Sequence, residues 1–212
     1  MNHKDKYLKY RNKYLEYKNK YLQLGKLNQN MNNKISELDY YKQQYKNGSS
    51  EAANKLGGVY FDKGNIPKML KYYKKAIDLG NINAMNNLGC YYKIVGDSKK
   101  EKDCFMKAVN KNDSLGMANM ASYYYDKKNF KKMIKYDLMD IEKGNRLATN
   151  NLAKYYWQIG DIQNMKKYFN MNIVKGNADS MYYLGNYFEE IKDNENMKKY
   201  YIMAYKHGKA LN

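Results

Sequence analysis

Residues that could act as nucleophiles, bases or metal ligands are few in this sequence and lie far apart. The only two histidines, His3 and His207, are near opposite ends of the 212 residues. They provide no base for a serine or cysteine nucleophile and no metal cluster. Cys90 and Cys104 have no other soft ligand around them, and Cys104 falls in an apolar column, so both thiols are expected to be buried or inert.

Acidic neighbours and glycine steps are the remaining candidates for catalysis. Glu189-Glu190 and Asp193-Glu195 fall in helical stretches, where adjacent carboxylates usually face water instead of forming an acid–base pair. No glycine run has the spacing and following Lys-Ser or Lys-Thr of a phosphate-binding loop. We therefore expect no enzyme activity, no catalytic residue, no metal and no cofactor.

Asparagine has the one regular arrangement that is suited to binding. Two adjacent columns of a 32-residue period contain six of these residues: Asn54, Asn86 and Asn150, then Asn87, Asn119 and Asn151. An amide both donates and accepts hydrogen bonds, so such a ladder can pair with the backbone of an extended peptide. Lys55 and Tyr183 interrupt it. The alternative is that abundant asparagine is simply tolerated on a polar helix face.

The 32-residue period organises most of the chain. One column contains a Leu or Met followed by Gly or Ala, and an aromatic residue follows four positions after the Leu or Met. The Leu/Met positions are Leu56, Leu88, Met120, Leu152 and Leu184. Such self-similarity indicates a helical repeat array. We number the repeats 1 to 5, at 52–83, 84–115, 116–147, 148–179 and 180–211.

Each repeat is predicted to contain two helices. In repeat 1, Leu56 and Tyr60 are four positions apart, and Met69, Tyr73 and Ala76 continue a helical apolar pattern. Asn or Asp recurs where the second helix should begin, and such side chains cap helices. These positions are Asn65, Asp97, Asn129, Asp161 and Asp193. The Gly or Ala after each Leu or Met should let the two helices approach closely, and the aromatic should fill the groove between consecutive repeats.

This spacing resembles a known family. Ala53, Leu56, Gly57, Tyr60 and Met69, with Tyr73 and Ala76, resemble the tetratricopeptide repeat, and GNADSMYYLG at 176–185 is similar to the Sel-one-like repeat. Both resemblances imply an α-solenoid that binds proteins or peptides without catalysis. They also imply that the first helices line a concave groove, as the asparagine ladder of the O-linked GlcNAc transferase family does.

The first fifty residues follow a second pattern. Residues 1–19 are predicted to form a basic amphipathic helix with heptad character, because KYLKYRN, KYLEYKN and KYLQLGK repeat every seven residues. This helix either packs on the array or mediates self-association. Residues 20–51 are predicted to be a degenerate repeat. The heptads also resemble N-terminal segments of proteins from giant DNA viruses of amoebae, which suggests a viral origin.

Charge and composition bear on partners and compartment. The sequence has 39 basic and 21 acidic residues, a net charge of +18. This charge reflects either AT-rich coding or an acidic partner, and it favours salt-sensitive attraction to RNA or DNA. The sequence lacks a long apolar run and an N-terminal h-region, so we expect no membrane span and no signal peptide. Two cysteines fit a reducing, cytoplasmic location, which is the host cytoplasm or the virion for a viral protein.

The predicted fold class is therefore all-α, a right-handed α-solenoid of stacked antiparallel helix pairs. The predicted function is a scaffold or adaptor that binds a protein or an extended peptide through the asparagine columns. A basic repeat that associates with nucleic acid is the first alternative. A structural component that self-assembles through the heptads or the C-terminal end is the second.

Overall fold

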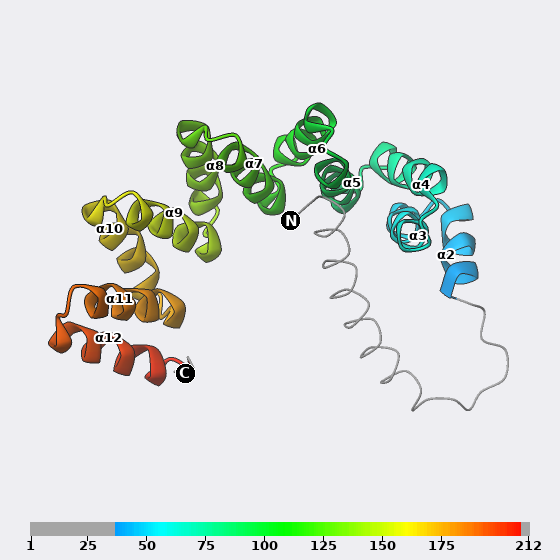
Figure 1. The fold of residues 1–212 in the computed structure, drawn as a ribbon. Helices are drawn as coiled ribbons and strands as arrows, with labels where there is room; N and C mark the ends of the chain where they lie inside the picture. Colours follow the sequence, from blue (N-terminus) through cyan, green and yellow to red (C-terminus); the bar gives the residue numbers. More distant parts are fainter. Residues whose placement is uncertain (1–36, 209–212) are drawn as a thin grey trace, which may run out of the picture. The chain divides into compact units, whose positions relative to one another are not determined.

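The computed structural model describes residues 37–208, which contain eleven α-helices and no strand (Figure 1). The first helices of the five repeats are α3 (Ser50–Asp62), α5 (Ile82–Val95), α7 (Ser114–Asp126), α9 (Arg146–Gln158) and α11 (Ala178–Glu190). The second helices are α4 (Ile66–Asp78), α6 (Ser98–Asn110), α8 (Phe130–Glu142), α10 (Ile162–Ile173) and α12 (Asn194–Lys206). Helix α2 (Glu37–Lys46) precedes them. The predicted all-α fold class is confirmed.

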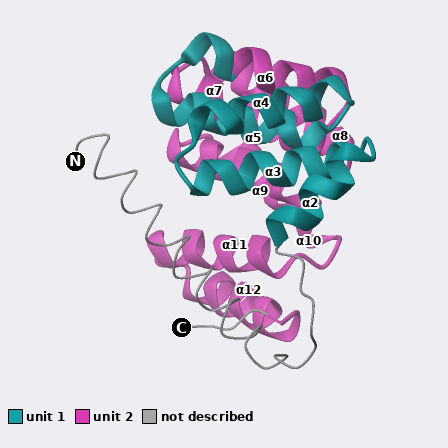
Figure 2. Ribbon diagram, turned by 90° about the vertical axis from the view of Figure 1, so that its right-hand side faces the viewer, with its two compact units in different colours: residues 1–101 teal, residues 102–212 magenta. Residues whose placement is uncertain are grey.

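The chain divides into two compact units, unit 1 (residues 1–101) and unit 2 (residues 102–212) (Figure 2). Helix α6 crosses the division. Unit 1 contains α2 to α5, and unit 2 contains α7 to α12. The heptads and most of the predicted degenerate repeat lie outside the described residues; α2 occupies the place of its second helix.

Capping side chains fix where the helices begin. Asn65, Asn129, Asp161 and Asp193 cap second helices, as the sequence predicted; each accepts a hydrogen bond from the backbone N–H three residues later. A second capping column precedes the first helices: Ser49, Asn81, Asp113, Asn145 and Asn177. Each cap satisfies a backbone donor that the helix leaves free. Because of this column, each first helix begins two residues before the repeat boundary drawn from the sequence.

Residues with a left-handed backbone conformation follow the helices at positions that recur from repeat to repeat. Most are glycines, but Lys128 (φ 55°) and Lys192 (φ 59°) take this conformation where Gly64 and Gly160 take it in other repeats. A side chain with a Cβ pays a steric cost there. The repeat geometry therefore imposes the turn on whatever residue is present.

Small residues bring the two helices of a hairpin together. A Cβ placed on Gly57 would lie 2.4 Å from Cδ1 of Tyr73, and one placed on Gly185 would lie 2.5 Å from Cδ1 of Tyr201. The ring of the second helix thus occupies the space that a larger residue would need. Close approach within the hairpin, expected from the sequence, is confirmed at these two positions.

The recurring aromatic residue makes a ring contact within its own hairpin. Its ring stacks on an aromatic residue of the second helix. That it also fills the groove between repeats stays a prediction. The ring centroids are 5.4 Å apart for Tyr60–Tyr72, 5.7 Å for Tyr124–Tyr136, 5.6 Å for Tyr156–Tyr168 and 5.4 Å for Phe188–Tyr200, with planes within 9° of parallel. Such offset pairs stabilise the hairpin beyond the area they bury.

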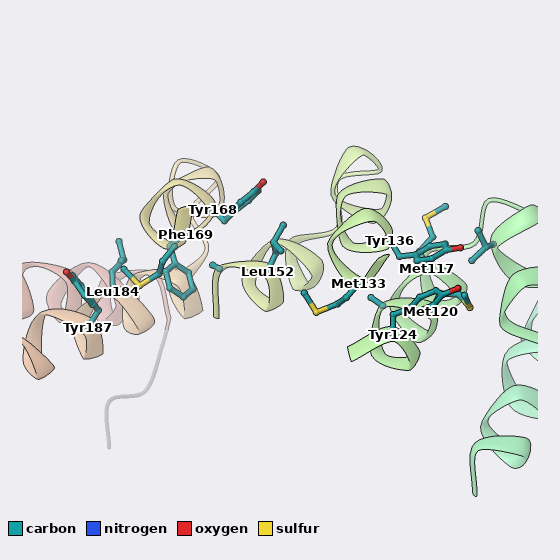
Figure 3. Close-up of a cluster of buried hydrophobic side chains, with 14 of the residues drawn as sticks. Met117, Met120, Tyr124, Met133, Tyr136, Leu152, Tyr168, Phe169, Leu184 and Tyr187 are labelled. Atoms are coloured by element: carbon teal, nitrogen blue, oxygen red, sulfur yellow. The ribbon is translucent and has the colours of Figure 1, made fainter. Parts of the chain in front are cut away.

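Unit 2 has one continuous hydrophobic cluster (Figure 3). Met120, Met133, Leu152, Phe169 and Leu184 are at its centre, with 0 to 4 % of their surface exposed. The Leu/Met column of the first helices, together with Met133 and Met165 of the second helices, therefore forms the interior that the repeat pattern predicted. Neighbouring hairpins bury each other's apolar faces, which is how repeat arrays gain stability.

A buried polar joint connects three helices at the start of α9. The Ser114 hydroxyl donates to the carboxylate of Asp140, and Asn145 Nδ2 donates to the other carboxylate oxygen at 2.8 Å. Asp140 has no exposed surface, and burial raises its pKa, although these two hydrogen bonds oppose that rise. Ala76, Ala108 and Ala204 occupy the same position in repeats 1, 2 and 5, and Asn172 occupies it in repeat 4. Repeat 3 thus carries a joint that its apolar counterparts cannot make.

Candidate functional site

The first of the two asparagine columns, which we call the inner column, lies inside the fold; the second, with Asn87, Asn119 and Asn151, is the outer column. Asn54, Asn86 and Asn150 have 6, 2 and 4 % of their surface exposed. Asn54 Oδ1 accepts from Asn87 Nδ2 at 3.0 Å. These three amides therefore support helix packing, and a ligand on the surface does not reach them.

Asn150 is the centre of a second buried joint. Its Oδ1 accepts from Asn172 Nδ2 at 2.8 Å and lies 2.5 Å from the hydroxyl of Ser180, and its Nδ2 donates to Asn177 Oδ1 at 3.3 Å. Asn172 Nδ2 also donates to the backbone carbonyl of Arg146 at 2.8 Å. The joint connects α9, α10 and α11, and buried networks of this kind are stable because each polar group is satisfied.

The outer asparagine column reaches the surface. Asn87 and Asn151 are exposed and Asn119 is half-buried. Asn119 and Asn151 both belong to unit 2, where they lie on the first helices α7 and α9. Only this column of the predicted site can meet a partner.

A cavity of about 320 Å³ opens beside Asn151 in unit 2. Helices α7, α8 and α9 line it. The lining residues are Ala118, Ala121, Ser122, Tyr125, Met133, Asp137, Asn151, Lys154, Tyr155 and Gln158. We call this cavity the Asp137 pocket. Its wall combines small apolar side chains, two tyrosines and amides with one carboxylate.

Asp137 stands at a position that is aromatic in every other repeat. The equivalent residues are Tyr73, Phe105, Phe169 and Tyr201. In repeats 1 and 5 the tyrosine ring lies against the small residue of the first helix, Gly57 or Gly185. In repeat 3 the ring is missing, and both Ala121 and Asp137 line open space. The pocket is therefore the space of an absent ring, extended toward α9.

The Asp137 carboxylate is nearly buried and has no partner. Only 5 % of the residue is exposed, and no hydrogen bond or ion pair to it occurs within residues 37–208. Desolvation, with a smaller contribution from the charge of Asp140, raises the pKa of Asp137 to about 7. A buried carboxylate without donors is unfavourable in its charged form, so the site gains from any donor or cation that enters.

Lys154 lines the pocket without neutralising Asp137. Its Nζ lies over the ring of Tyr183, 4.3 Å from the ring centroid. The aromatic rim is formed by Tyr125 and Tyr155, and Phe130 links them at centroid distances of 6.0 and 5.2 Å. Tyr125 also donates from its hydroxyl to Gln158 Oε1 at 3.2 Å. The rim thus bridges α7, α8 and α9.

The other residues considered for chemistry have structural contacts. Glu189 accepts from the Tyr201 hydroxyl at 2.7 Å, which helps raise the pKa of Tyr201 to about 12 after the larger effect of burial. Glu190 accepts from Trp157 Nε1 at 3.2 Å, and Asp193 caps α12. His207 Nδ1 lies 2.9 Å from the carbonyl of Met203.

The two thiols differ in position. Cys104 is buried, as expected. Cys90 is at the surface, whereas the sequence predicted a buried or inert thiol. Desolvation raises the pKa of the Cys90 thiol above the usual value. A thiolate is the reactive form, so Cys90 is expected to react slowly at neutral pH.

Lysines of the second helices contact aromatic rings of their own hairpins. Lys68, Lys100 and Lys132 lie over Tyr60, Tyr92 and Tyr124, with Nζ 5.1 to 5.3 Å from the ring centroid. These tyrosines are buried. The lysine column therefore presents charge to a partner, but the rings beneath it are not available to stack on bases.

Within the described part of the chain, no three His, Cys, Asp or Glu side chains come together as a metal site. No helix there has both the length and the apolar character that crossing a membrane requires.

Comparison with known proteins finds similarity to tetratricopeptide and Sel1 repeats. The sequence profile of the tetratricopeptide repeat matches residues 50–79, 82–110 and 148–170. No curated protein sequence matches the chain. The fold is similar to that of the Sel1 repeat protein from Oxalobacter formigenes, with a TM-score of 0.60 and 20% identity over 80% of this chain and 78% of that one.

Two further structures have a similar fold. One is c5321, a protective antigen of uropathogenic Escherichia coli strains that displays an SLR fold; its TM-score is 0.58, with 20% identity over 81% of this chain. Our chain spans 41% of its length. The other is YrrB, a TPR protein with an unusual peptide-binding site, with a TM-score of 0.52 and 15% identity over 81% of this chain and 93% of that one.

Proposed function

We propose that this protein, whose fold is similar to that of tetratricopeptide and Sel1 repeats, is an interaction scaffold, and that it binds an extended peptide along the first helices of unit 2. The Asp137 pocket is the observation that carries the proposal. It opens on the face where the sequence predicted a peptide ladder, and Asn151 of that ladder lines it. Its mixture of apolar wall, aromatic rim and amides is typical of ligand sites.

The contact residues that we propose are the asparagines of the outer column in unit 2, the half-buried Asn119 and the exposed Asn151. An asparagine side chain can donate to a peptide carbonyl and accept from a peptide N–H, so it recognises backbone without reading sequence. Specificity would then come from side chains that enter the pocket. In unit 1 the equivalent residue, Asn87, donates to the buried Asn54.

A selection of displayed peptides against the full chain tests this function. Changing Asn119 and Asn151 together to Ala should weaken the selected peptides about tenfold or more while circular dichroism remains unchanged. The matched control changes the exposed second-helix lysines Lys135 and Lys167 to Gln. Normal binding by the asparagine variant would refute the proposed contacts.

The same experiment separates the alternatives. Affinity for nucleic acid should fall steeply between about 50 and 200 mM salt, because bound phosphates release counterions. Binding that follows this slope and is lost in the lysine variant would favour a nucleic-acid partner. Self-association remains a separate proposal, and sedimentation of the full chain beside a 25–212 truncation tests the role of the heptads. The C-terminal end is the other predicted contact for self-association, and Tyr205, which lies there, is 68% exposed.

A further inference from the structure

We propose that the Asp137 pocket receives a single basic side chain, preferably arginine, from the bound peptide. This inference rests on the proposed function and specifies what enters the cavity. Its basis is the combination of a nearly buried carboxylate without a partner and an open space where other repeats have a ring. Aromatic side chains of the protein itself fill that place in repeats 1 and 5.

The wall of the pocket fits the stem of such a side chain. Ala118, Ala121 and Met133 give an apolar lining on the side of α7 and α8. Long basic side chains bury their methylene groups against surfaces of this kind while the charged end seeks a polar group. The cavity of about 320 Å³ has room for one side chain of this size.

The charged end would meet Asp137. A guanidinium can donate two parallel hydrogen bonds to one carboxylate, and the pair is stronger than a neutral contact. Asp137 has both oxygens available for this, since no described residue bonds to it. Tyr125 and Tyr155 at the rim favour a planar cation, because a guanidinium also stacks on aromatic rings.

Other charges around the pocket do not supply the missing partner. On α9, Lys154 places its ammonium over Tyr183. On α8, Asp140 is occupied by Ser114 and Asn145. The titratable group from α7 is the Tyr125 hydroxyl, which donates to Gln158. The net charge of +18 repels a cation at long range, so recognition must come from contacts inside the pocket.

Capped arginine amide is a suitable probe for the full-length protein. We expect it to shift the backbone NMR signals of Ala121 and Asn151 in 150 mM salt. Capped citrulline amide has nearly the same shape without the charge, and it should bind at least about tenfold more weakly. Arginine affinity should rise about tenfold from pH 6 to pH 8, because burial raises the pKa of Asp137 to about 7 and the cation needs the carboxylate ionised.

Two variants at one position identify the recognising group. Asp137→Asn keeps the shape and removes the charge, and it should reduce arginine binding about tenfold or more. Asp137→Phe restores the ring of the other repeats and should abolish binding by filling the space. Glu142→Gln is the matched control, because it removes an exposed carboxylate from the same helix; its binding should equal that of the original protein.

Three results would overturn the inference. They are equal binding of citrulline and arginine, unchanged arginine binding by Asp137→Asn in a protein with normal circular dichroism, and stronger binding of capped tyrosine amide, which would assign the pocket to an aromatic side chain. If selected peptides still bind and still depend on Asn119 and Asn151, the scaffold function stands and only the basic-residue pocket fails.

Discussion

Replacing Asp137 with Asn should change how the stability of unit 2 depends on pH. Asp137 is nearly buried, and desolvation raises its pKa in the folded state to about 7. In the unfolded chain the same carboxyl group titrates near 3.9. Between these values the folded protein binds more protons at this site than the unfolded protein does.

The sign and size follow from proton linkage. Stability falls as pH rises wherever the folded state binds more protons, so the group destabilises the fold progressively from about pH 4 to pH 7. Between pH 5 and pH 8 the loss amounts to about 2 to 3 kcal/mol in the free energy of unfolding. Asp137→Asn has no such titration, and its stability should therefore fall less over this range by that amount.

Trp157 provides the assay. It is the only tryptophan of the chain and lies on α9 in unit 2, with its ring near Phe169 and Tyr187. Urea unfolding followed by Trp157 fluorescence at pH 5 and pH 8 would measure the difference between the two proteins. Glu142→Gln is again the control. Parallel pH dependence in the original protein and Asp137→Asn would refute the reasoning, since it would mean that Asp137 is ionised and solvated at pH 5.

Two further substitutions test the repeat framework by the same urea assay. Asn150→Ala should lower the free energy of unfolding by about 1 to 3 kcal/mol, because Asn172 and Ser180 lose a buried partner. Asn151→Ala at the surface should lower it by less than about 0.5 kcal/mol. Equal effects of the two changes would contradict the buried joint. Lys128→Gly should stabilise unit 2 by about 1 kcal/mol, because glycine adopts the left-handed backbone (φ 55°) without steric cost. Lys127→Gly, at φ −85°, should not raise the free energy of unfolding. A lower free energy of unfolding for Lys128→Gly would contradict backbone strain at this position.

Most of the fold could be predicted from the sequence, because the 32-residue period is regular. Helix starts depend on local chemistry, and Asn65 and Asp161 cap where the pattern placed them. The capping residues before the first helices are also visible in the sequence, since Ser49, Asn81 and their equivalents recur every 32 residues. The predicted repeat boundary did not use them and therefore fell two residues late.

The site was less readable, because it depends on packing. Two adjacent asparagine columns look alike in sequence, yet a rotation of about 100° around the helix separates them, and only the neighbouring hairpin decides which one it covers. Asp137 was overlooked for a different reason. The sequence did carry its signal, an acid interrupting the aromatic series Tyr73, Phe105, Phe169 and Tyr201, but the cavity that results depends on whether surrounding side chains collapse into it.

The two buried joints bear on how a chain of near-identical segments sorts itself during folding. Apolar hairpins of equal length can pair out of order, since their surfaces are interchangeable. Two contacts of the joints cross from one hairpin to the next: Asn145 with Asp140, and Ser180 with Asn150. A hairpin seated on the wrong neighbour would leave Asp140 or Asn150 without that partner, at about 1 to 3 kcal/mol for each group. The joints thus favour one order of neighbouring hairpins in unit 2, through polar residues that are buried in the folded chain.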